Sequence, residues 1–325
     1  LFEENQRHAD SGAPVAWSQA SQRATGLRLL KDNQLIDVHA GKELILSAGS
    51  IGSVQLLEAS GVGSARILSA LQIPVVLDQP AIGENLQDHL QIRTVYKIKG
   101  AKTVNSLYKN PLTRLRMGLE YALFRTGPLT MPPSTLGAFA KSQPTLTSPD
   151  LEWHVQPLSL PKFGEPLHPF DAITPSVCNL RPSSRGSVHI QHPETLASPK
   201  IQCNYLSTED DINASVRGLE ITRAIMRSHA LARFEPQEFL PGPSVRTTEE
   251  LAQAARELGT TIFHPVGTCA MGTVLDSDCR LRGIAGLRVV DASAMPLITS
   301  GNTNAPVMLI AQRAAESIVR DNSAL

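Results

Sequence analysis

The feature that most constrains the fold is a strand, a glycine turn and a helix that follow one another within residues 42–63. Residues 42–47 form a largely apolar run, typical of a strand in a covered sheet, and Gly49 lies in the turn after it. Apolar residues then recur at helical spacing, and Gly61 is placed to end the helix in a left-handed conformation. A helix that starts directly after a strand points its free N–H groups toward an anion. The stretch therefore predicts an α/β unit with a place for a negatively charged ligand group.

A second helix start with a similar character lies near the C-terminus. Pro306 suits the first turn of a helix, and apolar residues follow it on one helical face. Asn302, Thr303 and Asn304 would then stand at the helix N-terminus, where the helix dipole favours negative charge. Asn304 could be a simple N-cap, but capping does not explain Asn302 and Thr303.

His264, Asp291 and Ala292 are further candidates for the same site. His264 ends a short apolar run, and the ordinary pKa of histidine suits proton transfer near neutrality. The alternative, common for a single histidine, is a hydrogen-bonded residue of the core. Asp291 and Ala292 follow an apolar run, and ligands of α/β sheets gather beyond the carboxyl ends of strands. An aspartate that caps a turn is the alternative there.

Two other patterns, one typical of dinucleotide binding and one of metal binding, are not supported by the residues around them. Gly61-x-Gly63 superficially resembles a dinucleotide fingerprint, but it follows a helix where the fingerprint must follow a strand. A nicotinamide enzyme is therefore less favoured. His189 and His192 would point to opposite faces of a strand, so we expect no metal at that pair.

Composition excludes several functional classes. The 30 Lys and Arg balance the 30 Asp and Glu, and aromatic residues make up only 4%, so nucleic-acid binding is not expected. The four cysteines form no C-x-x-C pair, which gives no sign of a zinc ribbon or a redox dithiol. No signal peptide or membrane-spanning run is visible, and we expect a location in the cytoplasm or on the inner face of a membrane. The first residues, from Leu1, resemble the end of a strand, so we expect an N-terminal part of a longer protein to be missing.

The middle of the chain has a different texture from its ends. Its expected strands are separated by turns rich in Pro, Ser and Gly rather than by regular helices, which predicts a mainly antiparallel sheet. These strands cover residues 92–98, 151–156, 173–180, 187–191 and 200–205. Helices are expected at residues 111–124, after the acidic start at Thr208, and after Thr247. The proline-rich residues 127–134 are a candidate lid.

Several segments, taken together and in order, resemble the glucose–methanol–choline (GMC) family of flavin-dependent oxidoreductases. They are the Ser-Ala-Gly-Ser block at 47–57 with 60–63, Gly-Glu-Asn-Leu-Gln-Asp-His at 83–89, Leu-Arg-Pro-Ser-Ser-Arg-Gly at 180–186, and the blocks around His264 and Asn302. The Asn302 block is most similar to that of choline dehydrogenase and related FAD-dependent alcohol dehydrogenases. Val54 departs from the usual proline or serine, and nothing matches the family's N-terminal strand with G-x-G-x-x-G.

This resemblance implies the fold class and the domains. We expect an α/β chain, α+β overall, with an incomplete Rossmann-like FAD-binding part and an antiparallel-sheet substrate domain. Residues 1–90 would belong to the FAD-binding domain without its G-x-G-x-x-G half, and residues 91–255 to the substrate-binding domain. Residues 256–325 would return to the FAD-binding domain and carry the catalytic loops.

The resemblance also implies the chemistry. FAD would be the cofactor, His264 the base that takes the hydroxyl proton of a primary alcohol, and Asn302 a hydrogen-bond partner of the same oxygen. Cofactor contacts would come from Ala48, Gly49, Asp291, Ala292, Asn302, Thr303 and Asn304. The expected partners are a small alcohol, choline among the options, oxygen or a quinone as electron acceptor, and the missing N-terminal segment. The substrate roof would draw on Trp153, Phe163, Phe170 and Phe263.

Two alternatives stay open at this point. The chain could be one of two chains that assemble into a working enzyme, or a non-catalytic protein that has kept the fold.

Overall fold

The structure is a computed structural model that describes residues 2–4, 22–132, 134–162, 164–194 and 197–323. The described residues form two compact units that alternate along the sequence. Unit 1 contains Leu1–Asp88, Ser184–Asn204 and Phe263–Leu325, and unit 2 contains His89–Ser183 and Tyr205–Ile262. Residues 184–204 lie within the predicted 91–255 segment, yet they belong to unit 1.

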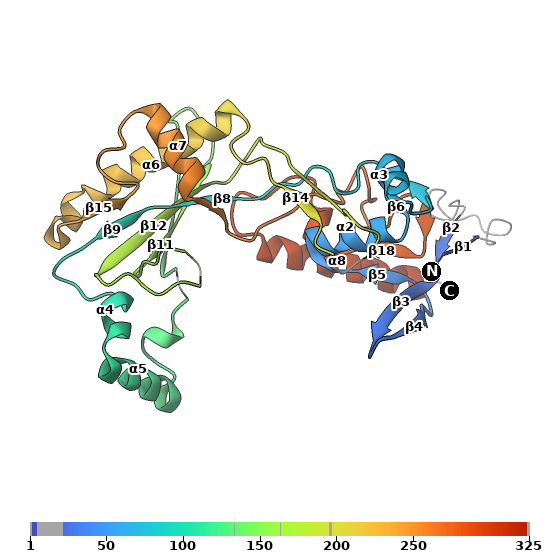
Figure 1. The fold of residues 1–325 in the computed structure, drawn as a ribbon, viewed down its shortest axis with the longest axis horizontal. Helices are drawn as coiled ribbons and strands as arrows, with labels where there is room; N and C mark the ends of the chain where they lie inside the picture. Colours follow the sequence, from blue (N-terminus) through green and yellow to red (C-terminus); the bar gives the residue numbers. More distant parts are fainter. Residues whose placement is uncertain (1, 5–21, 133, 163, 195–196, 324–325) are drawn as a thin grey trace. The chain divides into compact units, whose positions relative to one another are not determined.

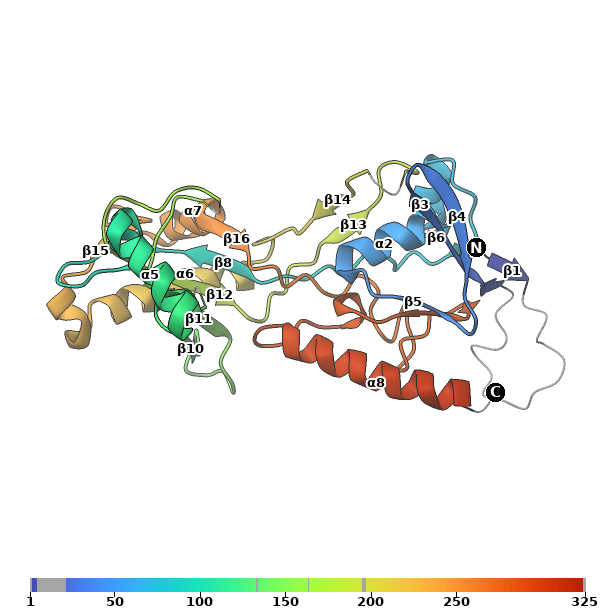
Figure 2. The same cartoon turned by 90° about the horizontal axis from the view of Figure 1, so that it is seen from below.

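Unit 1 is built on the predicted strand, turn and helix (Figure 1). Strand β5 (Leu44–Leu46) leads into helix α2 (Gly49–Ala59), and β5 pairs in parallel with β18 (Leu287–Val289). Gly61, directly after the C-cap of α2, has a φ of +83°, as its predicted role as a left-handed C-cap requires. Figure 2 shows α8 (Asn304–Ser323), the long C-terminal helix, running beside β5. Ala314 of α8 and Leu46 of β5 are buried in the same core.

The remaining elements of unit 1 are short. Strand β2 (Gln22–Ala24) pairs with β1 (Phe2–Glu4) and with β17 (Ile284–Ala285). Strands β3 (Gly26–Lys31) and β4 (Gln34–His39) form an antiparallel hairpin, and Asp32 and Asn33 of its turn both have positive φ. The other elements are β6 (Val62–Gly63), α3 (Ala65–Ala70), β7 (Leu77–Asp78), β13 (Ser187–His189), β14 (Lys200–Gln202) and the 3₁₀ turn η3 (Ala292–Ala294). Residues 5–21, between β1 and β2, lie outside the described part of the chain.

Unit 2 is a seven-stranded antiparallel sheet with helices packed against it. The strand order is β10, β11, β12, β8, β16, while β9 pairs with β12 and with β15. These strands are β8 (Leu90–Arg93), β9 (Val95–Lys97), β10 (Leu136–Ala140), β11 (Leu151–Gln156), β12 (Ala172–Asn179), β15 (Gln237–Leu240) and β16 (Gly259–Thr261). The predicted antiparallel sheet is thus confirmed, although the expected strands at 187–191 and 200–205 became β13 and β14 of unit 1.

Helices α6 (Glu209–Met226) and α7 (Thr248–Leu258) pack on β12 and β8 of unit 2. Both begin as predicted, since the side chains of Thr208 and Thr247 accept the N–H groups of Asp211 and Glu250. The helix expected at 111–124 is α5 (Pro111–Phe124), which follows α4 (Val104–Lys109). Two 3₁₀ turns, η1 (Pro128–Thr130) in the candidate lid and η2 (His229–Phe234), complete the unit.

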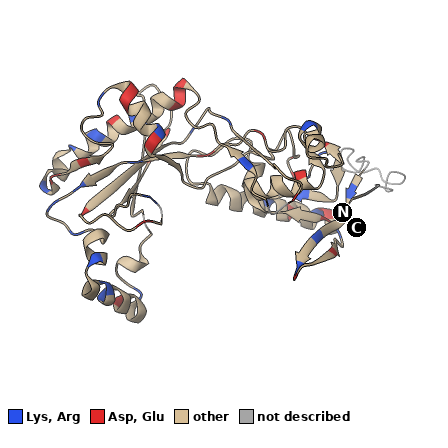
Figure 3. Ribbon diagram, in the orientation of Figure 1, with Lys and Arg blue, Asp and Glu red and all other residues tan. Residues whose placement is uncertain are grey.

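Charge is distributed without a dominant sign. Figure 3 shows basic and acidic residues interspersed along the helices and loops of both units, in keeping with a formal net charge of zero. Among the described residues, no helix is long and apolar enough to cross a membrane.

Candidate active site

The two residues predicted to carry the chemistry, His264 and Asn302, lie side by side in unit 1. The Nδ2 atom of Asn302 is 3.5 Å from Nε2 of His264. Asn302 is exposed and His264 is half-buried, so a small molecule can reach both side chains. The residues are far apart in the sequence, and the structure brings together the two polar groups that the resemblance assigned to one substrate oxygen.

The main chain of His264 is held by the polar loop that follows β7. Its N–H donates to Oδ1 of the buried Asp88 at 3.0 Å. Two residues further along, Val266 and Gln87 exchange both main-chain hydrogen bonds at 2.9 and 3.0 Å. These three bonds place the histidine at the end of a short antiparallel bridge, with its side chain directed by a fixed backbone.

Gly267 lets the two loops approach this closely. Its φ is +97°, and a Cβ at this position would lie 2.5 Å from the carbonyl oxygen of Asn85. The side chains of Asn85 and Gln87 then donate to the carbonyl of Pro296, at 3.2 and 3.1 Å. Gln87 also accepts the N–H of Ile298 at 3.1 Å. The same loop therefore fixes both the His264 segment and the segment that leads to Asn302.

Helix α8 begins directly after the candidate pair. The carbonyl of Thr303 accepts the N–H of Val307 at 3.0 Å, which is the first turn of the helix, and Thr303 is buried. Asn302 and Asn304 are exposed at this end. The positive end of the α8 dipole is therefore open to an anionic or electron-rich group.

Asp291 ties two parts of unit 1 together. Its Oδ2 accepts the N–H of Gly49 at 2.9 Å and the hydroxyl of Ser53 at 2.6 Å. Its Oδ1 accepts the N–H and the hydroxyl of Ser293 at 2.8 and 2.5 Å. Since the buried carboxylate and the Gly49 N–H already satisfy each other, a ligand near Ala292 would meet main-chain groups rather than this side chain.

The start of α2 has room for a ligand. Gly49 has a φ of +77°, and no atom lies within 4 Å of the place where its Cβ would be. Its neighbour Ala48 is exposed. Ser50 joins this helix start to the histidine loop, because its hydroxyl donates to the carbonyl of Pro265 at 2.6 Å and its carbonyl accepts the hydroxyl of Thr268 at 2.7 Å. At the start of α2 the N–H groups of Ala48 and Gly49 are already bonded to Ser53 and Asp291, so the predicted anion site is not free at these two groups. The open space beside Gly49 and the exposed start of α8 still leave room for a dinucleotide cofactor.

Sequence reasoning missed the residues that position the site. Asn85, Gln87 and Asp88 were only part of a polar loop, and their hydrogen bonds with residues about 200 positions away depend on the tertiary fold. Their one local signal is the density of polar side chains in Gly-Glu-Asn-Leu-Gln-Asp-His. Cys269, in the same loop as His264, is not a nucleophile, since burial raises the pKa of its thiol to about 12.

The aromatic residues expected in a substrate roof have separate environments. Phe263 is 73% exposed in unit 1, and Phe163 lies outside the described residues. In unit 2, Phe170 stacks on His168 with 5.0 Å between ring centroids. Trp153 is buried and donates from Nε1 to Oγ1 of Thr222 at 2.7 Å.

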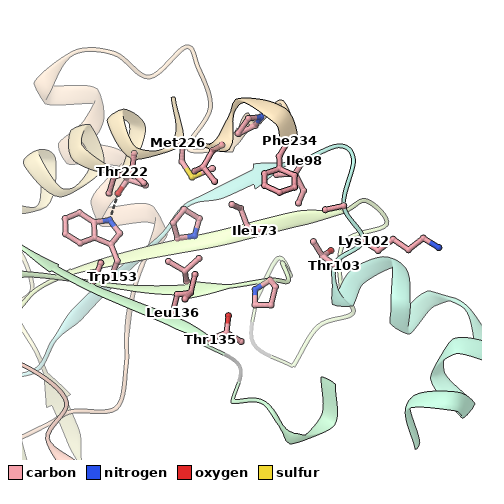
Figure 4. Close-up of a pocket in the computed structure, with 18 residues that line it drawn as sticks. Ile98, Lys102, Thr103, Thr135, Leu136, Trp153, Ile173, Thr222, Met226 and Phe234 are labelled. Carbon is pink, nitrogen blue, oxygen red and sulfur yellow. Dashed lines mark hydrogen bonds between the residues drawn. The ribbon is translucent and has the colours of Figure 1, made fainter. Parts of the chain in front are cut away.

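Trp153 also lines an apolar cavity of about 400 Å³ between the sheet of unit 2 and the end of α6. Figure 4 shows Ile173, Leu136 and Met226 around the same space.

Comparison with known proteins agrees with these features. Two family profiles, both described as GMC oxidoreductase, match residues 14–91 and 182–311. The chain is 38% identical to an alcohol dehydrogenase [acceptor] of Pseudomonas putida over 306 residues, which are 92% of this chain and 55% of that protein. It is also 38% identical to the human mitochondrial choline dehydrogenase over 302 residues, or 91% of this chain and 51% of that protein. The chain thus spans about half the length of the curated relatives it matches.

Solved structures show the same fold. Pyridoxine 4-oxidase from Mesorbium loti superimposes with a TM-score of 0.75 at 29% identity, over 91% of this chain and 54% of that one. A formate oxidase superimposes with a TM-score of 0.86 at 22% identity, over 93% and 58% of the respective chains. The sequence blocks, the fold and the relatives agree, and the chain belongs to the GMC oxidoreductase family, whose members are FAD-dependent flavoproteins.

Proposed function

We propose that this chain carries the catalytic pair of an FAD-dependent enzyme that oxidises a primary alcohol to an aldehyde. The observation that carries the proposal is the 3.5 Å approach of Asn302 Nδ2 and His264 Nε2 beside the open start of α8. A single substrate oxygen placed between these two groups would meet a proton acceptor and a hydrogen-bond donor at the same time.

The residues have distinct tasks. His264 in its neutral form takes the hydroxyl proton at Nε2, and Asn302 donates an N–H to the same oxygen as negative charge develops on it. FAD, when bound, supplies the acceptor for the hydride that leaves the alcohol carbon. The N-terminal end of α8 stabilises the negative charge that accompanies this transfer. Main-chain groups at 48–49 and 291–292, with Thr303 and Asn304, would hold the cofactor.

The substrate class rests on the relatives. Two of them are named for alcohol and choline, which supports a small primary alcohol as substrate, with choline among the options. We further propose that oxygen or a quinone accepts the electrons and that the protein resides in the cytoplasm or on the inner face of a membrane.

The test separates proton transfer from cofactor binding. We expect His264→Ala to slow anaerobic reduction of the flavin by an alcohol by roughly 10²–10⁴-fold, the range of general base catalysis, while the bound flavin measured by visible absorbance changes little. Asn302→Ala should also slow reduction, and Asn302→His should restore part of the rate because it returns a donor. His192→Ala, which removes an exposed histidine elsewhere in unit 1, is the matched control.

Two outcomes would overturn this assignment. Equal loss of flavin and of reduction rate in His264→Ala would make the histidine a cofactor residue. A protein that never holds flavin would favour the non-catalytic alternative.

A further inference from the structure

Three potential metal ligands meet on one face of the sheet of unit 2. Glu152 and His154 are two residues apart on β11, so their side chains point to the same face. Cys178 on β12 is the direct cross-strand partner of Glu152 in the antiparallel register. One ligand atom from each residue lies within 4.8 Å of the other two. A carboxylate, an imidazole and a thiol are therefore gathered by strand geometry alone.

The cluster is buried and its carboxylate is incompletely satisfied. Glu152 is 3% exposed and Cys178 is 1% exposed. In the part of the chain that the structure describes, Oε2 of Glu152 has no hydrogen-bond partner. A buried carboxylate with an unpartnered oxygen is costly, and a cation bound to the carboxylate would offset part of that cost by neutralising its charge.

We propose that Glu152, His154 and Cys178 bind a zinc ion through one carboxylate oxygen, Nε2 and Sγ. Imidazole, thiolate and carboxylate are the ligands that zinc takes in proteins, whereas Mg²⁺ and Ca²⁺ favour oxygen alone. Zinc bonds of about 2.0 Å to nitrogen and oxygen at a tetrahedral angle place these two atoms about 3.3 Å apart. The distance from Glu152 Oε1 to His154 Nε2 is 3.3 Å. Three protein ligands leave a fourth position for water or another small ligand.

A fourth residue, Gln91, contacts the ring nitrogen of His154 that would not bind the metal. Gln91 on β8 is the register partner of Cys178, and its side-chain amide lies 3.1 Å from Nδ1 of His154. With zinc on Nε2, Nδ1 carries the proton and donates it to the amide oxygen of Gln91 once this amide is turned by 180°. Gln91 therefore acts as a positioning residue that selects the tautomer with Nε2 free to coordinate.

The alternative is a hydrogen-bonded Glu152–His154 pair beside an inert buried thiol. The two cases differ in the state of Cys178. Zinc binding displaces its thiol proton and forms a metal–sulfur bond, whereas the alternative leaves the thiol protonated. Cobalt(II) takes the place of zinc in such sites and reports this bond as a thiolate-to-metal charge-transfer band.

The experiment titrates the metal-free 325-residue protein with Co²⁺ and follows near-ultraviolet absorption. We expect a charge-transfer band that saturates at one equivalent, is displaced by Zn²⁺, and accompanies release of a proton. Cys178→Ser should abolish the band, and Cys203→Ser, a half-buried cysteine of unit 1, should leave it intact. Gln91→Ala should weaken binding by about 10–100-fold without removing the band.

Folding is checked independently. Glu152→Gln keeps the shape of the side chain, so its circular dichroism should match the parent protein while its Zn²⁺-induced rise in melting temperature disappears. No band at one equivalent, a band that survives Cys178→Ser, or equal stabilisation of parent and Glu152→Gln by Zn²⁺ would each overturn the proposal.

Discussion

A single side chain, Asp88, links the polar loop of unit 1 to the candidate base. The base itself was predictable, because histidine has the right pKa and stands in a recognisable block. Its support was not, since the bond from the His264 N–H to Oδ1 of Asp88 joins residues 176 positions apart. Asp291 shows the same limit, because the sequence indicated a residue near a ligand and the structure shows a carboxylate with four internal hydrogen bonds.

We predict that Asp88→Ala slows flavin reduction, and that this slowing exceeds what its loss of folding stability explains. Loss of the acceptor leaves the His264 N–H unsatisfied, which costs about 1–3 kcal/mol, and frees the backbone that directs the imidazole. Asp88→Asn keeps an oxygen acceptor and should recover most of the rate. Stopped-flow absorbance of the flavin gives the rate, and urea unfolding gives the stability.

Asp78 offers a matched control for this effect. Its Oδ1 accepts the N–H of Ala65 at 2.8 Å, which is the same kind of side-chain to main-chain bond at the start of α3. Asp78→Ala should reduce stability without a specific effect on reduction. Equal slowing by the two alanine variants would show that Asp88 has no special role in placing His264.

At the scale of elements, local signals were sufficient for the longer helices, whereas the six-residue helix α4 was not predicted. The starts of α6 and α7 follow from Thr208 and Thr247, because capping is made by residues within one turn. Strands β10, β15 and β16 were missed, and β10, Leu-Gly-Ala-Phe-Ala, and β15, Gln-Glu-Phe-Leu, contain no β-branched residue. Their existence depends on pairing with distant strands, which no local pattern records.

The contact between α2 and β13 is a buried ionic arrangement that should respond to pH. His189 of β13 lies 2.7 Å from the fully buried Glu58 of α2 and 3.0 Å from Glu84, with Lys200 as its cross-strand neighbour. Burial by itself would lower the pKa of His189, but hydrogen bonds and charges of the two glutamates outweigh it and raise the pKa. The protonated histidine is thus favoured in the folded state.

We predict that this contact weakens as pH rises. A raised folded pKa means that the stabilisation is fully present below the unfolded value of about 6.5 and is lost as pH increases through the higher folded value. Urea unfolding followed at a series of pH values should show this loss in the parent protein and a flatter profile in His189→Gln. His192→Gln, an exposed histidine near the end of the same strand, should keep the parent profile. An unchanged profile in His189→Gln would contradict the assignment.

At the scale of the whole molecule, the chain leaves unit 1 and returns to it twice. The turn composition indicated a change near residue 91, and the family resemblance implied a return to the first domain near residue 256. Neither signal indicated that residues 184–204 belong to unit 1, since β13 and β14 look like any other antiparallel strands. Assignment of these strands needs their packing, and Val188 is buried in the core of unit 1.

The two units have cores with no residue in common, and we predict that each core controls its own unfolding. Leu275 is buried in unit 1 and Leu219 in unit 2, and replacement of either by alanine should cost about 2–5 kcal/mol locally. Trp153 reports unit 2, because in a Trp17→Phe background it is the single tryptophan of the chain. In that background Leu219→Ala should lower the midpoint of the fluorescence transition, whereas Leu275→Ala should lower a circular dichroism transition and leave the fluorescence midpoint in place. Equal shifts of the fluorescence midpoint by both variants would mean that the two cores unfold as one cooperative unit.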